Sequence, residues 1–158
     1  MVLSDAEIER LILLEKTVAN PKAKKLEKRG SVQVNYDAEA ETGERFRIYV
    51  RQNMRIPEGF SCGLLYTPPS GEPVTLTRYN GSDHEHANPL DGGGSMPAAC
   101  HIHRATERYM RAGRKAEHFA ETTGRYTNLE GALRALIQDC NIKGLSDNSS
   151  DPTQLPLL

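Results

Sequence analysis

Two stretches of alternating apolar and polar residues constrain this chain to a fold that contains an antiparallel sheet. In residues 32–36 the apolar side chains occupy every second position, and the same alternation returns in residues 46–50. Successive side chains of a β-strand point to opposite faces, so each stretch predicts a strand with one buried face. Glu-Thr-Gly-Glu at residues 41–44 is typical of a hairpin turn between them. Three more strands are predicted over about residues 60–66, 74–79 and 98–104.

Helical spacing flanks these strands at both ends of the chain. Ser4 and Glu7 form a capping box, and the apolar residues that follow predict a helix over about residues 5–19. A second capping box at residues 127–130 precedes an apolar stripe, which predicts a helix over about residues 128–140.

The order of these elements predicts one α+β domain over residues 1–143. We expect a curved antiparallel sheet of about five strands, with an N-terminal and a C-terminal helix packed on one of its faces. Residues 144–158 are rich in serine, aspartate and proline, and we expect them to form a disordered tail.

Charge and hydropathy narrow the class of protein. The chain has 158 residues and a net charge of -1, so any contact with nucleic acid would need a local basic patch. It shows neither a signal peptide nor an apolar run of the roughly 20 residues that a membrane span needs. Three widely spaced cysteines disfavour a disulfide framework or a cysteine zinc site, and we expect them to be buried: Cys62, Cys100 and Cys140. We therefore expect a cytoplasmic protein with no membrane partner.

Histidines gather in one short part of the chain. His84, His86, His101 and His103 lie within twenty residues of one another. His101 and His103 are two positions apart on a predicted strand, so their side chains share a face. The glycine-rich loop between the two pairs can bring His84 and His86 back over them. His118 lies in a polar segment and is expected to be exposed.

One interpretation of the histidine cluster is metal-independent cleavage of RNA. Histidine titrates near neutral pH, so His84, His86, His101 and His103 can supply the base and the acid of such a reaction. Arg78 can hold the phosphate through two hydrogen bonds. Further contacts to RNA are expected from two tyrosines and three basic residues: Tyr79, Tyr109, Arg104, Lys24 and Lys25. The alternative for the basic run around Lys24 and Lys25 is a solvated segment. This interpretation needs no cofactor.

Two other interpretations of the same residues remain open. The two His-x-His pairs could supply four imidazole ligands to a zinc ion, with Asp83 or Glu85 supporting them from behind. No carboxylate is clearly placed to complete a set of three ligands. The histidines could also be structural, with the first pair in a polar loop and His101 as a hydrogen-bonded core residue.

Several motifs resemble a family of small uncharacterised bacterial proteins. The resemblance covers roughly residues 30–142 and rests on an Arg-Phe strand, an Arg-x-Asn strand end, a histidine loop that ends in Asn-Pro, and a His-x-His strand, found at residues 45–51, 76–81, 84–89 and 101–103. It extends to the segment Leu136-Ile137-Gln138-Asp139-Cys140-Asn141-Ile142.

That family is in turn distantly similar to the TumE-type ribonuclease toxins of toxin–antitoxin pairs. The resemblance implies a RelE/barnase-like sheet, cleavage of RNA and an antitoxin protein as partner. Carried over by position, it implies a site made of one arginine and four histidines: Arg78, His84, His86, His101 and His103. The sequence thus favours a small bacterial ribonuclease. The alternative is a non-enzymatic module that binds a metal or inhibits another protein.

Overall fold

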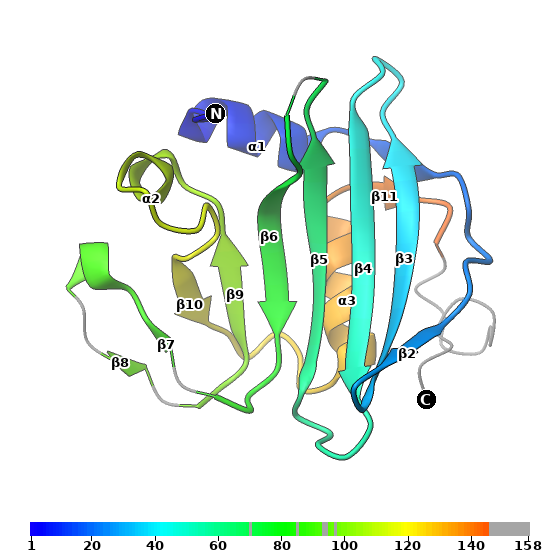
Figure 1. Ribbon diagram of the computed structural model, residues 1–158, viewed down its shortest axis with the longest axis vertical. Coiled ribbons are helices and arrows are strands. Elements are labelled where there is room, and N and C mark those ends of the chain that lie inside the picture. Colours follow the sequence, from blue (N-terminus) through cyan, green and yellow to red (C-terminus); the bar gives the residue numbers. More distant parts are fainter. Residues whose placement is uncertain (70, 85, 93–94, 97, 146–158) are drawn as a thin grey trace.

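A strongly curled sheet forms the body of the protein in a computed structural model that describes residues 1–69, 71–84, 86–92, 95–96 and 98–145 (Figure 1). Within these residues the main sheet has nine strands: β1 (Lys16–Val18), β2 (Leu26–Lys28), β3 (Ser31–Glu39), β4 (Arg45–Asn53), β5 (Phe60–Thr67), β6 (Val74–Asn80), β9 (His101–Arg104), β10 (Ala120–Thr122) and β11 (Ile142–Lys143). Their order is β10-β9-β6-β5-β4-β3-β1-β11, and β2 pairs with β3 outside this path. β7 (His86–Ala87) and β8 (Ser95–Met96) form a separate two-stranded sheet.

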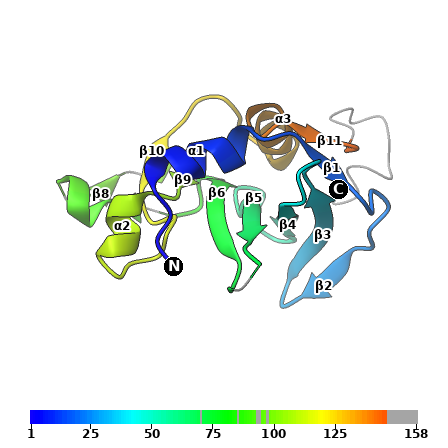
Figure 2. The same ribbon diagram turned by 90° about the horizontal axis from the view of Figure 1, so that it is seen from above.

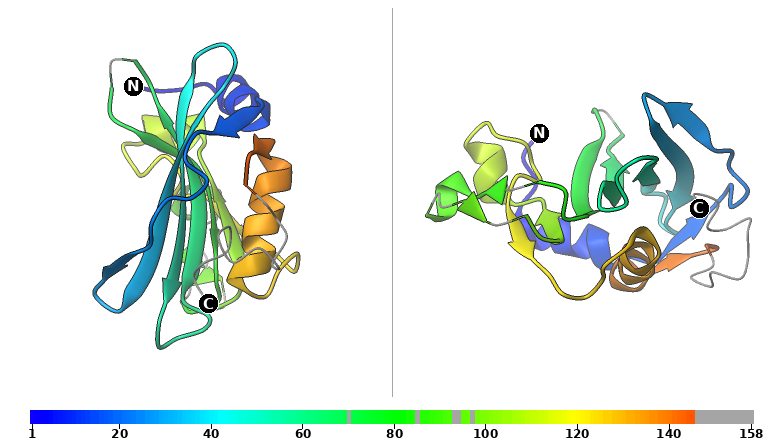
Figure 3. Two further views of the ribbon diagram at one scale, coloured as in Figure 1. Left: turned by 90° about the vertical axis from the view of Figure 1, so that its right-hand side faces the viewer. Right: turned by 90° about the horizontal axis from the view of Figure 1, so that it is seen from below.

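The helices confirm the α+β class predicted from the sequence. α1 (Asp5–Leu13) and α3 (Leu129–Asp139) lie on the same face of the main sheet, as Figures 2 and 3 show. α2 (Glu107–Arg111) and a short 3-10 turn, η1 (Pro89–Asp91), lie beyond β9, toward the end of the sheet where β7 and β8 are found (Figure 1). Within the described residues no helix is long and apolar enough to cross a membrane.

The sheet has more strands than the five predicted. The additional strands were missed because they are short. β3, β4, β5 and β6 form the expected antiparallel meander, and β9 pairs with β6. β1, β2, β10 and β11 have only two or three residues each, too few for alternation to be recognised in a sequence. β1 pairs in parallel with β11, so the sheet is mixed rather than purely antiparallel.

The core lies between the sheet and its two helices. Val34, Ile48 and Leu64 are fully buried on neighbouring strands, and they meet Leu133 and Leu136 of α3 in one hydrophobic cluster. Because strand residues alternate between faces, the odd-numbered positions of β3 and β4 face the opposite side, which no helix of the described residues covers. Two of the three cysteines, Cys62 and Cys140, are buried as expected, and Cys100 is half-buried.

The first helix is shorter than predicted. Its N-terminus is confirmed, since the Ser4 hydroxyl accepts the Glu7 amide at 3.1 Å. The chain leaves the helix at Leu14, whose ψ is 133°. Residues 16–18 then form β1 between β3 and β11, so pairing on both sides outweighs the helical pattern that continues to Val18.

The C-terminal helix begins at the N-cap Asn128, whose side chain accepts the Gly131 amide at 2.9 Å. Beyond β11, Gly144 and Leu145 still pack against the protein, and Leu145 is buried. The rest of the predicted tail, residues 146–158, lies outside the described residues.

Candidate functional site

The strand β9 places His101 and His103 on the face of the sheet opposite the helices. Its neighbour β6 pairs with it so that Asn80 stands beside His101 and Arg78 beside His103. Tyr126 fixes the ends of both strands, because its hydroxyl lies 2.9 Å from the Asn80 carbonyl and 3.1 Å from the His101 carbonyl. Two histidines and an arginine are therefore held side by side on rigid strands.

The segment after β6 folds back over these strands and brings the other predicted histidines to them. The His86 ring lies 4.7 Å from the His103 ring and 5.6 Å from the His101 ring, between centroids. The His84 ring lies 5.0 Å from that of His101, although its side chain stays half exposed and its Nδ1 bonds Asp83 at 2.8 Å. Glu85 lies outside the described residues.

His118 also joins this group, so the expectation that it is exposed is wrong. It is half-buried, with its ring 5.4 Å from the His86 ring. The ring of Tyr109 stacks on the His118 ring, with 5.4 Å between their centroids. All five histidines of the chain thus form one connected cluster.

Hydrogen bonds fix the tautomers of the two strand histidines. His101 Nδ1 lies 2.8 Å from the Ala99 carbonyl, and His103 Nδ1 lies 2.9 Å from the Glu117 carbonyl. A carbonyl accepts only, so each Nδ1 carries the proton and each Nε2 keeps a free lone pair. Both Nε2 atoms are buried and have no hydrogen-bond partner among the described residues.

Burial also keeps these two rings neutral. It lowers the pKa of His101, and, together with the nearby Arg78, it lowers the pKa of His103 to about 3. A buried imidazole that is neutral at physiological pH is a ready ligand for a metal ion and a poor proton donor.

Asn88 holds the third histidine in the cluster. Its side-chain amide bonds the backbone of Ala120 twice, accepting the N–H at 2.9 Å and donating to the carbonyl at 2.7 Å. These two hydrogen bonds identify which end of the Asn88 amide is the oxygen. The oxygen also lies 2.9 Å from His86 Nε2, which must therefore donate. Burial lowers the pKa of His86, although its hydrogen bonds to the Asn88 side chain and to the backbone of His118 favour the charged form.

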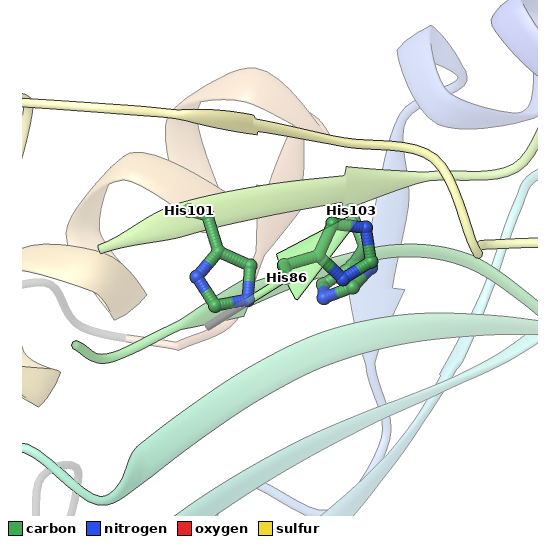
Figure 4. A group of neighbouring side chains, drawn as sticks. All are labelled: His86, His101 and His103. Carbon is green, nitrogen blue, oxygen red and sulfur yellow. The ribbon is translucent and has the colours of Figure 1, made fainter. Parts of the chain in front are cut away.

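His86, His101 and His103 form a group that could hold a metal ion. Each offers one ring nitrogen, and these atoms lie within 4.8 Å of one another (Figure 4). Nitrogen ligands on a tetrahedral zinc ion lie about 3.4 Å apart for Zn–N bonds of about 2.0–2.1 Å. The nitrogen atoms would therefore need to approach one another by up to about 1.4 Å to bind a zinc ion. Three protein ligands leave a fourth position open, which is typical of catalytic zinc.

Glu117 connects the centre to Arg78. Its carbonyl orients His103, and its carboxylate lies 3.3 Å from Arg78 Nη1. Arg78 Nε is buried and has no partner among the described residues. The arginine is therefore held beside the histidines with donors still available for a ligand.

The other residues expected to contact RNA are either buried or distant from the histidines. Tyr79 is buried in the core on the helix side, and Tyr109 is buried under His118, so neither ring is free to stack on a base. Arg104 is exposed, but it shares the helix side with Tyr79. Lys24 and Lys25 are exposed just before β2, and three strands separate β2 and β3 from β9. The structure thus brings only Tyr109 to the histidine cluster, as a buried ring, and leaves the other four residues away from it.

Three residues of the site could not be recognised in the sequence: Asn88, Glu117 and His118. Asn88 was visible only as part of an Asn-Pro pair, which is typical of a turn. Glu117 and His118 precede β10 in a segment without periodicity, and the pairing of β10 with β9 brings them to the cluster.

Comparison with known proteins places the chain in a family. No curated protein and no solved structure gives a significant match to it. A family model described as a family of unknown function, DUF6978, matches residues 3–142. Because this match covers most of the chain, the protein belongs to that family.

Proposed function

We propose that the protein is a metal-dependent hydrolase whose zinc or similar divalent ion is held by His86, His101 and His103. The observation that carries the proposal is the pair of buried Nε2 lone pairs on His101 and His103, which have no partner among the described residues. A buried polar atom without a partner costs free energy, and a metal ion would remove that cost. The backbone carbonyls behind both rings are the supports that metal-bound histidines usually have.

The coordination position left open on the metal determines which reaction the site could catalyse. A zinc ion with three histidine ligands can bind and acidify a water molecule, which then acts as a nucleophile at neutral pH. Arg78 lies beside His103 and can stabilise negative charge that develops on a reacting group. His84 is half exposed and bonded to Asp83, so its ring lies where a ligand can reach it from solvent.

Cobalt titration of metal-free protein tests the proposal, because Co(II) in a tetrahedral site gives visible absorption bands. We expect one Co(II) or zinc ion per chain, and loss of binding in His101→Ala and His103→Ala. His118→Ala is the matched control, since His118 touches His86 but lies outside the group of three ligands. Equal loss of binding in the control, or no binding by the unaltered protein, would contradict the metal site.

Metal-independent cleavage of RNA is the second candidate, with a toxin–antitoxin pair as its setting. The position of Arg78 beside His103 favours it, since an arginine next to imidazoles suits a phosphodiester. Its weakness is that burial lowers the pKa of His86, His101 and His103 alike, so that three of its four histidines are poor proton donors. RNA cleavage that persists in a chelator, and arrest of growth on expression of the chain alone, would favour this candidate over the metal-dependent hydrolase.

A further inference from the structure

A polar hollow lies on the open face of the sheet, next to the histidine cluster. It has a volume of about 490 Å³, within the range of pockets that hold small molecules. β3, β4, β5 and β6 form its floor, and His84 and Asp83 stand at its edge. The side chains that matter for its chemistry are two arginines, two amides and two hydroxyls: Arg51, Arg78, Gln33, Asn80, Tyr49 and Ser61.

The floor continues directly from the proposed metal centre. Strand pairing places His101, Asn80, Ser61 and Arg51 in one row across β9, β6, β5 and β4. Neighbouring strands lie about 4.8 Å apart, so three steps separate His101 from Arg51 by about 14 Å. This row is long enough for a ligand that touches the metal at one end and Arg51 at the other.

Hydrogen bonds set the centre of the floor in one arrangement. The Ser61 hydroxyl donates to the Asn80 side chain at 2.8 Å and lies 2.9 Å from the Tyr49 hydroxyl, which must then donate to it. Gly63 makes room for the Tyr49 ring, since a Cβ there would lie 2.7 Å from that ring. With these groups bonded to one another, the floor is polar and ordered before any ligand arrives.

The charges around the hollow favour binding of an anion at the end near the histidines. Three neutral imidazoles would leave a divalent metal ion with its full charge, because the two carboxylates nearby already have partners, Glu117 with Arg78 and Asp83 with His84. A phosphate monoester carries a charge of about -1.5 to -2 at pH 7, which matches this excess. Arg78 Nε, buried and without a partner among the described residues, is the donor expected to meet it.

We propose that the hollow binds a phosphate ester with a polar organic part, such as a nucleotide or a sugar phosphate. The phosphoryl group lies between the metal centre and Arg78, and the organic part extends over Asn80 and Ser61 toward Arg51. This inference rests on the proposed function for the metal charge at the phosphoryl end, and it assigns the class of substrate for that site.

Calorimetric titration of the zinc-loaded protein tests this assignment with four probes. They are adenosine monophosphate, ribose 5-phosphate, inorganic phosphate and adenosine. We expect at least one of the two phosphate esters to bind ten times more tightly than inorganic phosphate or adenosine. Tight binding of adenosine monophosphate alone would identify the ligand as a nucleotide, and equal binding of both esters would identify a sugar phosphate. Failure of both esters to exceed inorganic phosphate would overturn the assignment.

Two arginines on β4 provide matched variants. Arg51 lines the hollow, whereas Arg47 lies four residues away on the same face, outside the hollow and paired with Asp37. Arg51→Gln should weaken binding of the tighter ester about tenfold, and Arg47→Gln should leave it unchanged. Equal effects of the two substitutions would contradict the proposed position of the ligand.

Metal binding is measured separately, so a failure of the metal site can be distinguished from a failure of the substrate class. If Co(II) binds to the three histidines but neither ester binds, the metal centre stands and the substrate class is wrong. If an ester binds equally well to zinc-loaded and metal-free protein, the hollow is a phosphate-ester site that does not depend on the metal. That second outcome would overturn the proposal that the metal centre and the hollow bind one ligand together.

Discussion

At the scale of single residues, the parity of a position on a strand decides whether it belongs to the site. Arg78 and Tyr79 are adjacent in the sequence, and both were candidates for contacts to RNA. Their side chains point to opposite faces, so Arg78 stands beside His103 while Tyr79 enters the core. There the Tyr79 hydroxyl donates to Asp139, whose carboxylate also accepts two hydrogen bonds from Arg125 at 2.7 and 2.9 Å.

The Asp139 carboxylate should make stability depend on pH in the acid range. Burial acts to raise its pKa, but the hydrogen bonds from Arg125 and Tyr79 outweigh burial and hold the pKa below its usual value. The unfolded chain therefore binds this proton at a higher pH than the folded one. The stabilisation is present above the ordinary aspartate pKa and is lost as the pH falls through the lowered value.

Asp139→Asn should lower the free energy of unfolding by about 1–3 kcal/mol at pH 7 and by much less near pH 2. Urea denaturation at a series of pH values measures both quantities. Asp37→Asn is the control, because Asp37 makes an exposed ion pair with Arg47 and should change stability by less than about 1 kcal/mol. A loss for Asp139→Asn that stays the same at every pH would contradict this explanation.

At the scale of elements, sequence patterns predicted the parts of the fold that are long and regular. β3 and β4 have nine residues each, so their alternation is clear, and α3 shows an unbroken apolar stripe. The His-x-His pair on β9 could be predicted for the same reason, since a period of two puts both rings on one face.

Elements that depend on distant partners could not be predicted from local pattern. β1 exists because β3 and β11 pair with it on both sides, although its residues continue the helical spacing of α1. His118 and Glu117 reach the histidine cluster through the pairing of β10 with β9, and nothing in the sequence around them indicates that pairing. Long-range strand pairing thus forms the edge of the sheet, and it also brings Glu117 and His118 to the site.

The segment between β7 and η1 should control metal affinity through Asn88. Asn88→Ala removes the acceptor that orients His86, and loss of such a support typically costs 10- to 100-fold in metal affinity. We expect a loss of that size for zinc, measured by competition with a chromogenic chelator. Asn35→Ala is the control, because Asn35 is an amide on β3, far from β9 in the sheet, and should leave zinc affinity unchanged. Equal zinc affinity of the two variants would rule out a role for Asn88.

At the scale of the whole molecule, one buried lysine joins the C-terminal ends of α1 and α3. Lys16 has no exposed surface, and its ammonium donates to the carbonyls of Ile12, Leu14 and Cys140 at 2.8, 2.6 and 2.9 Å. The first two carbonyls end α1 and the third follows α3, so a single cation meets the negative ends of two helices. Burial lowers the pKa of Lys16 to about 8, which still leaves it charged at neutral pH.

Lys16→Met should destabilise the entire fold without changing the site. It leaves two buried carbonyls and a partly buried one without this donor, at a cost of about 2–4 kcal/mol in the free energy of unfolding. Lys143→Met, an exposed position on the neighbouring strand β11, should cost less than about 0.5 kcal/mol. Urea denaturation compares the two variants, and Co(II) titration should give the same affinity for both. A Lys16→Met protein as stable as the control would show that the three hydrogen bonds contribute little.

The two hydrogen bonds between Asn88 and Ala120 also affect whether a second molecule can pair with the edge of the sheet. β10 is the last strand at its end of the main sheet, and Ala120 turns its N–H and carbonyl outward. Free backbone groups on such a strand are a template for strand addition by a second chain. The amide of Asn88 occupies them as a neighbouring peptide group would. The side chain that orients a histidine therefore also shields part of the sheet from self-association.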